Sequence, residues 1–133
     1  MKTIKVNSLR EIDKLVAEHL FNWADFIVFN TYLYGIPPLT ADEGNDNETI
    51  NKIDVVYVPE YSSYIETAWK IVNLFPELYL IKHEEKTYNC SIYIEALNEN
   101  SDFYATGQTA ELAICLAALK VKNIEVIYEN TIG

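Results

Sequence analysis

The stretch TGQTAELAICLAALKVK, residues 106–122, opens with small polar residues and a glycine and continues with apolar residues at helical spacing. Thr109 stands where an N-cap residue is expected, directly before the apolar run. The stripe predicted to be buried consists of Leu112, Cys115, Leu116 and Leu119. Two roles are open for the polar cluster: it only starts a helix, or it also offers backbone N–H groups to an anionic ligand.

Two further helices are predicted upstream, and each begins at an S-x-x-E capping box. Ser8 and Glu11 precede a first run of apolar residues at helical spacing. Ser63 and Glu66 precede a second run, which Pro76 ends. The chain therefore contains three predicted amphipathic helices.

Strands are predicted between these helices. FIVFNTYLYGIPP, residues 26–38, is rich in β-branched and aromatic residues and is expected to form one strand. Shorter strands are expected at 55–58, about 78–83 and 87–95, and IEVIY, residues 124–128, as a final strand or an arm. The acidic segment 40–52, the turn 83–86 and the segment 97–102 are expected to be loops.

This order of elements predicts an α+β fold in a single domain spanning residues 1–133. We expect an antiparallel sheet of about four strands with three helices packed on it, as an α/β/α sandwich. No glycine-rich phosphate loop follows any predicted strand.

Charge restricts the class of partner. The chain has a net charge of −10, with nine Lys and the single arginine Arg10, so no basic face for duplex nucleic acid can be assembled. No apolar run approaches the roughly 20 residues of a membrane span, and no signal peptide is found, so we expect a cytoplasmic protein. Cys90 and Cys115 show no C-x-x-C pattern and are predicted to be buried free thiols.

Four segments resemble the phage ABA-sandwich domain family, whose members are small proteins encoded in bacteriophage and prophage genomes. They are DKLVAEHLFNW (13–23), VPEYSSYIETAWKIVNLF (58–75), YNCSIYI (88–94) and ATGQTAELAICLAALK (105–120). The resemblance implies a phage-encoded protein and brings no established catalytic residues. Two departures from the family pattern are Leu116, where arginine often follows the cysteine, and a segment between Trp23 and Pro59 without tryptophan.

Candidate ligand-binding residues lie at the starts of the second and third helices. Each start presents unpaired backbone N–H groups and the positive end of a helix dipole, and nearby aromatic rings could stack on a base. The predicted ligand-binding residues are Trp23, Tyr61, Ser62, Trp69, Thr106, Gly107, Gln108 and Thr109. The alternative is structural, with the polar residues acting only as caps and the tryptophans packing in the core.

No catalytic motif is present, and His19 has no second metal ligand at a suitable spacing. We therefore expect a non-enzymatic binding protein without a cofactor or a metal, acting as a homo-oligomer. The phage resemblance favours counter-defence, in which a sponge sequesters a nucleotide-derived immune signal such as a cyclic oligonucleotide or an ADP-ribose derivative. One alternative is an acidic decoy that inhibits a host defence protein. A second is a hydrolase that acts on the signalling nucleotide.

Overall fold

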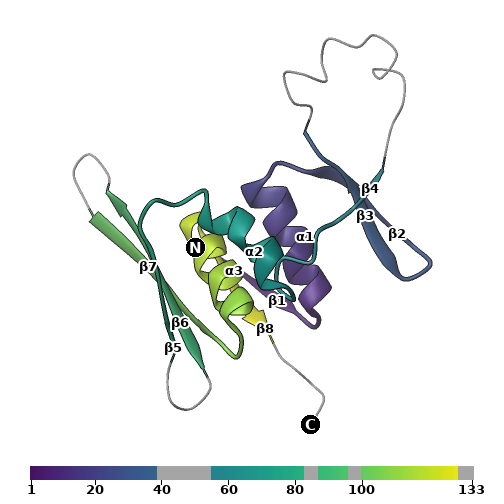
Figure 1. The fold of residues 1–133 in the computed structure, drawn as a ribbon. Helices are drawn as coiled ribbons and strands as arrows, with labels where there is room; N and C mark the ends of the chain where they lie inside the picture. Colours follow the sequence, from purple (N-terminus) through teal and green to yellow (C-terminus); the bar gives the residue numbers. More distant parts are fainter. Residues whose placement is uncertain (39–54, 83–86, 96–99, 129–133) are drawn as a thin grey trace.

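The structure is a computed structural model that describes residues 1–38, 55–82, 87–95 and 100–128 (Figure 1). The expected loops at 40–52 and 83–86 lie outside these residues. The elements are β1 (Lys2–Val6), α1 (Leu9–Leu20), β2 (Ala24–Phe29), β3 (Tyr32–Ile36), β4 (Val56–Tyr57), α2 (Ile65–Val72), β5 (Leu78–Lys82), β6 (Tyr88–Glu95), β7 (Asn100–Gly107), α3 (Ala110–Val121) and β8 (Ile124–Tyr128).

The described strands form three small sheets. The orders β2-β3-β4 and β5-β6-β7 are antiparallel, whereas β1 and β8 pair in parallel. The expected α+β class is confirmed. The strands outnumber the expected four, and the helices lie between the β5-β6-β7 sheet and the β2-β3-β4 sheet (Figure 1).

Helix α3 explains this layering. Its buried residues surround the helix instead of forming one stripe: Leu112, Ala113, Ile114, Cys115, Ala117, Ala118 and Leu119. A helix that is apolar all round must be covered on every side. Strands β6 and β7 cover one side, and α1, α2 and β8 cover the others, so α3 is the centre of the core.

Two of the three predicted helix starts are confirmed. At α1, Glu11 N donates to Ser8 Oγ at 3.3 Å and Ser8 N donates to Glu11 Oε2 at 3.0 Å, which completes the capping box. At α3, Leu112 N donates to Thr109 Oγ1 at 3.2 Å. The predicted box at the second helix is wrong. The N–H groups of residues 63 and 64 both donate to Glu60 O, so this turn delays α2, whose N-cap residue makes no side-chain cap bond.

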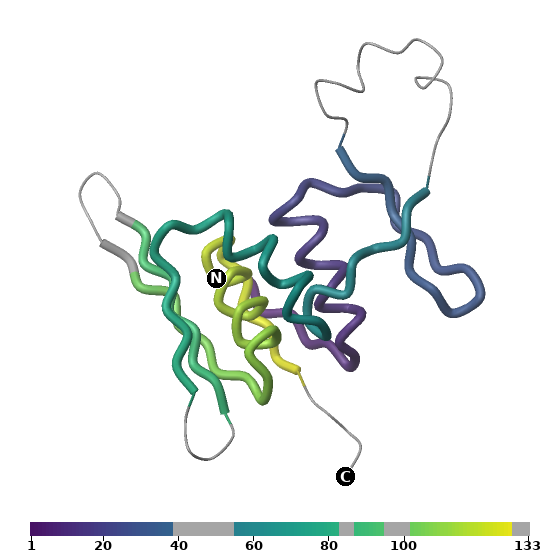
Figure 2. Tube along the Cα trace, viewed as in Figure 1, coloured from purple at the N-terminus to yellow at the C-terminus, as the bar shows by residue number. Residues whose placement is uncertain are grey.

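The prediction of one strand over 26–38 is also wrong, because the segment is a hairpin. Asn30 and Thr31 have φ values of 51° and 67°, and such a pair forms a tight two-residue turn between β2 and β3. The hairpin lies beside α1, and its tip projects beyond the helices (Figure 2). The loop prediction at 97–102 fails in part, since β7 begins at Asn100. The expected strand at 124–128 is confirmed as β8.

Candidate functional site

The turn before α2 is bound by a carboxylate from α1. Asp13 is fully buried, and its Oδ1 accepts hydrogen bonds from Ser62 N at 2.8 Å and from Ser62 Oγ at 2.6 Å. Its Oδ2 accepts from Nη1 of Arg10 at 2.8 Å. The backbone N–H of Ser62, a predicted ligand-binding group, therefore already donates to a side chain of the protein itself.

Arg10 joins α1 to the segment around β4. Its Nη2 donates to Val58 O at 2.9 Å, and its guanidinium carbon lies 4.9 Å from the centre of the Tyr57 ring. Burial raises the pKa of the Asp13 carboxyl above its usual value, although the hydrogen bonds from Ser62 and the charge of Arg10 act in the opposite direction. This cluster was not predicted from the sequence. The one available signal was the i, i+3 spacing of the only arginine and an aspartate on a predicted helix.

Two of the predicted aromatic residues are held by the core. Tyr61 is 2% exposed and stacks on Phe21 with 5.2 Å between ring centres. Burial raises the pKa of its hydroxyl. Trp23 is partly buried and packs beside Gly35, where an added Cβ would lie 3.1 Å from the indole. Trp69, in contrast, is 54% exposed on α2.

The segment that leads into α3 borders a cavity of about 400 Å³, which is within the usual size of small-molecule pockets. Its wall comes from the end of β7, the first two turns of α3, and β8. The lining residues are Thr106, Gly107, Gln108, Leu112, Leu116, Val126 and Tyr128. None of these is acidic. Three of the eight predicted ligand-binding residues thus share one cavity, which Tyr61, Ser62, Trp23, Trp69 and Thr109 do not line.

Gly107 allows β7 to pass close to α3 beside this cavity. A Cβ at this position would lie only 2.7 Å from Ala113 N, so any side chain would push the strand and the helix apart. Leu116, the departure from the family pattern, lines the same cavity and makes its wall apolar where arginine would add a charge. That these residues bind a ligand stays a prediction.

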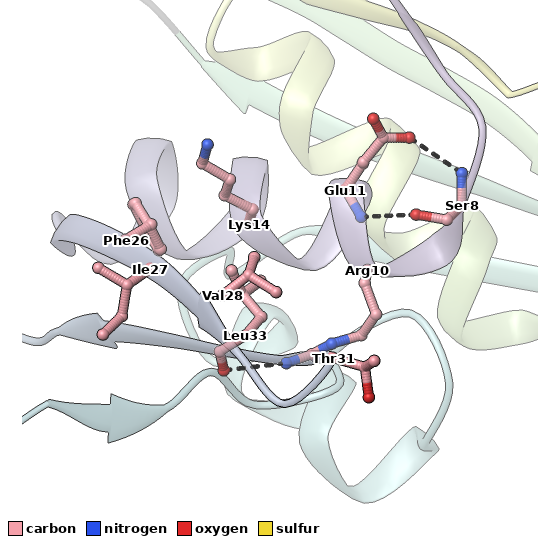
Figure 3. Close-up of a pocket in the computed structure, with 9 residues that line it drawn as sticks. All are labelled: Ser8, Arg10, Glu11, Lys14, Phe26, Ile27, Val28, Thr31 and Leu33. Atoms are coloured by element: carbon pink, nitrogen blue, oxygen red, sulfur yellow. Dashed lines mark hydrogen bonds between the residues drawn. The ribbon is translucent and has the colours of Figure 1, made fainter.

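A second cavity of about 320 Å³ lies between α1 and the β2–β3 hairpin, and the sequence did not indicate it (Figure 3). It is lined by Ser8, Arg10, Glu11, Lys14, Phe26, Ile27, Val28, Thr31 and Leu33. Lys14 Nζ lies 5.5 Å from the centre of the Phe26 ring. Arg10 is paired with Asp13, and Lys14 and Glu11 add one charge of each sign to the wall, so this cavity, like the α3 cavity, offers an anion no net positive charge.

Within the described residues, the other chemically reactive side chains do not form a centre. Cys90 and Cys115 are buried free thiols, as predicted, and burial raises the pKa of both, that of Cys90 to about 12. Nε2 of His19 lies 3.9 Å from Glu18 Oε2. Over the described ranges, no three His, Cys, Asp or Glu side chains cluster as metal ligands would. In the same ranges, none of the helices has the length and apolar character needed to cross a bilayer.

Comparison with known proteins agrees with this fold. The family model described as the phage ABA sandwich domain matches residues 14–119. The crystal structure of a phage protein from Bacillus cereus ATCC 14579 is similar, with a TM-score of 0.61 and 20% sequence identity, over 92% of this chain and 94% of that chain. At this identity the likeness shows the fold alone. No curated protein matches the sequence.

Proposed function

The chain belongs to the phage ABA sandwich domain family, and we propose that this phage protein acts by binding a small anionic, nucleotide-derived ligand in the cavity at the start of α3. The observation that carries the proposal is a cavity of about 400 Å³ without a carboxylate in its wall, in a chain with a net charge of −10. The net charge would repel a ligand phosphate from much of such a surface, whereas the wall of this cavity adds no negative charge of its own.

The polar side chains in the cavity wall are Thr106 and Gln108, and the first turn of α3 follows them directly along the chain. The N–H groups of Ala110 and Glu111 belong to the first turn of α3, where no intrahelical acceptor exists. A helix N-terminus favours an anion by about 0.3–1 kcal/mol, and a hydrogen bond to a charged group contributes about 1.5–3 kcal/mol. The Glu111 carboxylate in the same turn opposes an anion, so the phosphate is expected nearer Gln108.

The apolar part of the cavity suits the base or ribose. Tyr128 offers a ring, and stacking on an aromatic side chain contributes about 1–3 kcal/mol per base. One stacked base with two charge-assisted hydrogen bonds sums to about 4–9 kcal/mol before the cost of ordering the ligand and the protein is subtracted. Micromolar binding of about 8 kcal/mol is sufficient for a protein made in large amounts to lower the free concentration of a signal.

The ligand we propose is an immune signal of the host, a cyclic oligonucleotide or an ADP-ribose derivative, so that binding would protect the phage. Support comes from the phage family and from analogy with small phage proteins that act in this way without catalysis. No reaction is needed for this role, and the site as described contains no nucleophile paired with a base.

The test is a retention experiment. Purified protein is incubated with ADP-ribose and a cyclic dinucleotide, separated by gel filtration, and the bound fraction is identified by mass spectrometry. We expect retention by the wild type and at least a tenfold loss in Leu116→Asp, which adds a carboxylate to the wall. Val28→Asp adds the same charge to the second cavity, at a residue 71% exposed, and serves as the matched control.

Each outcome of this experiment decides between the alternatives. Failure of the wild type to retain either nucleotide at micromolar protein rejects the proposal and favours the acidic decoy. Equal loss in both variants places binding elsewhere and rejects the α3 cavity. Recovery of a converted nucleotide replaces sequestration by hydrolysis.

A further inference from the structure

Strand β5 is an edge of the β5-β6-β7 sheet, and half of its backbone groups point away from that sheet. Tyr93 N donates to Glu77 O at 2.9 Å, which marks these two residues as a hydrogen-bonded pair. Because such pairs alternate in an antiparallel ladder, Tyr79 and Ile81 also bond to β6. The N–H and C=O groups of the even-numbered residues 78, 80 and 82 therefore face outward.

The opposite edge of this sheet is protected at Tyr104, whereas β5 has no such bond. On β7, Tyr104 O points outward and accepts a hydrogen bond from Lys120 Nζ at 2.6 Å. On β5, no described side chain or backbone group bonds to the outward groups of residues 78, 80 and 82. Proteins normally block an edge strand with charges, bulges or a covering element, and an apolar edge without them pairs readily with another strand.

The side chains of β5 are also exposed. The strand LYLIK places Tyr79 and Ile81 on the face turned away from α3, where they are 59% and 57% exposed. Leu80, on the other face, is 40% exposed. Four of the five residues are apolar or aromatic, and the only charge is Lys82 at the end. Such a surface is expected to be covered in the working protein.

We propose that β5 pairs antiparallel with β5 of a second copy, about a two-fold axis at Leu80. The two sheets would join into one six-stranded sheet with α3 of both copies on the same side. For this arrangement, each even-numbered residue of one β5 must lie opposite an even-numbered residue of the other. Centred on Leu80, it sets residue 78 opposite residue 82 of the second copy, so all the outward groups of both strands meet. Other registers that keep α3 of both copies on the same side leave at least one residue of each β5 without a partner.

A second copy fits this edge better than an unrelated strand because the edge is complementary to itself. In this register Tyr79 of each copy faces Ile81 of the other, and these aromatic–aliphatic pairs cover the two most exposed hydrophobic side chains of the strand. The antiparallel direction also brings Glu77 of one copy to the end of β5 that carries Lys82 of the other. The interface is isologous and closes as a dimer. It does not depend on the proposed ligand.

The first experiment measures mass by light scattering after gel filtration, over a concentration series in the micromolar range. We expect the wild type to reach about twice 15.3 kDa and Ile81→Lys to remain at 15.3 kDa, because the lysine faces Tyr79 of the second copy. Tyr104→Lys changes a 47% exposed residue on the same face at the protected edge, and it should remain dimeric. A monomeric wild type, or a dimeric Ile81→Lys that is folded by circular dichroism, overturns the proposal.

The second experiment tests the register. Opposed residues in a non-hydrogen-bonded pair have Cα atoms about 4.5 Å apart, within the range that a disulfide spans. Mixed Tyr79→Cys and Ile81→Cys proteins should therefore form a cross-linked heterodimer on oxidation. Each variant alone should cross-link at least tenfold less, since its own cysteines are offset by two residues along the strands. Equal cross-linking by the single variants overturns the register.

Discussion

The buried Asp13 carboxylate predicts how strongly α1 is tied to the segment before α2. Replacing Asp13 by alanine removes the acceptor of three hydrogen bonds, two from Ser62 and one from Arg10. Removing one partner of a buried ion pair costs about 3–5 kcal/mol. The Arg10 side chain is 28% exposed and can recover some hydration, so we expect the lower end, about 3 kcal/mol.

This loss is large against the total stability of a domain, which is about 5–15 kcal/mol. Urea unfolding followed by circular dichroism gives the difference, read from the midpoint at unchanged slope. The matched control is Glu18→Ala, which removes an exposed carboxylate from the same helix and should change stability by less than about 0.5 kcal/mol. A loss below about 1 kcal/mol for Asp13→Ala would refute the reasoning, because buried donors left without an acceptor are more costly than that.

Three further predictions follow from burial and close packing. Burial raises the pKa of Asp13 above 3.8, so the folded state binds this proton more tightly than the unfolded chain does. The stability of the wild type relative to Asp13→Asn should therefore fall as the pH rises from 3.8 through the folded-state pKa. A stability difference that does not change with pH would contradict this prediction. Cys90 and Cys115 should react with a thiol reagent at least about 100-fold more slowly in native than in denatured protein, and immediate reaction of the native protein would show that they are accessible. Gly107→Ala should cost about 1–3 kcal/mol, because its Cβ meets Ala113 N at 2.7 Å, and an unchanged unfolding midpoint would mean that β7 can move away without loss.

Local sequence signals predicted the parts of the fold that local chemistry determines. Ser8 with Glu11, and Thr109, satisfy N–H groups within three residues of themselves, so their helices could be predicted from spacing alone. The turn at Asn30 and Thr31 was missed because it lacks the glycine that usually marks a two-residue hairpin.

The layer order depends on contacts between distant segments. For α3, the apolar residues at helical spacing predicted the helix but only one of its buried faces. Its alanines, such as Ala113 and Ala117, are buried as fully as Leu119, and this shows that α3 is covered on every side. One sequence does not show whether an alanine faces solvent or a neighbouring helix, because alanine is common in both environments.

The residues of the candidate site also fall into those that local sequence predicted and those that depend on contacts between distant segments. Thr106, Gly107 and Gln108 were found from sequence and share a cavity, because the start of α3 and the end of β7 are adjacent along the chain. Ser62 was expected to be open but is bound by Asp13, 49 residues away, which no local pattern shows. The second cavity was missed for the same reason, since Lys14 and Phe26 meet only when the hairpin folds against α1.

The anionic ligand is proposed to bind beside the start of α3 and not at the turn before α2. An NMR titration of the labelled protein with ADP-ribose and with a cyclic dinucleotide observes both sites at once through their backbone amides. We predict saturable shifts of the amides of Gln108, Ala110 and Tyr128, with the Ser62 amide unmoved because it stays bonded to Asp13. Shifts confined to Ser62 or to residues around Lys14, or no shifts at millimolar ligand, would contradict the account.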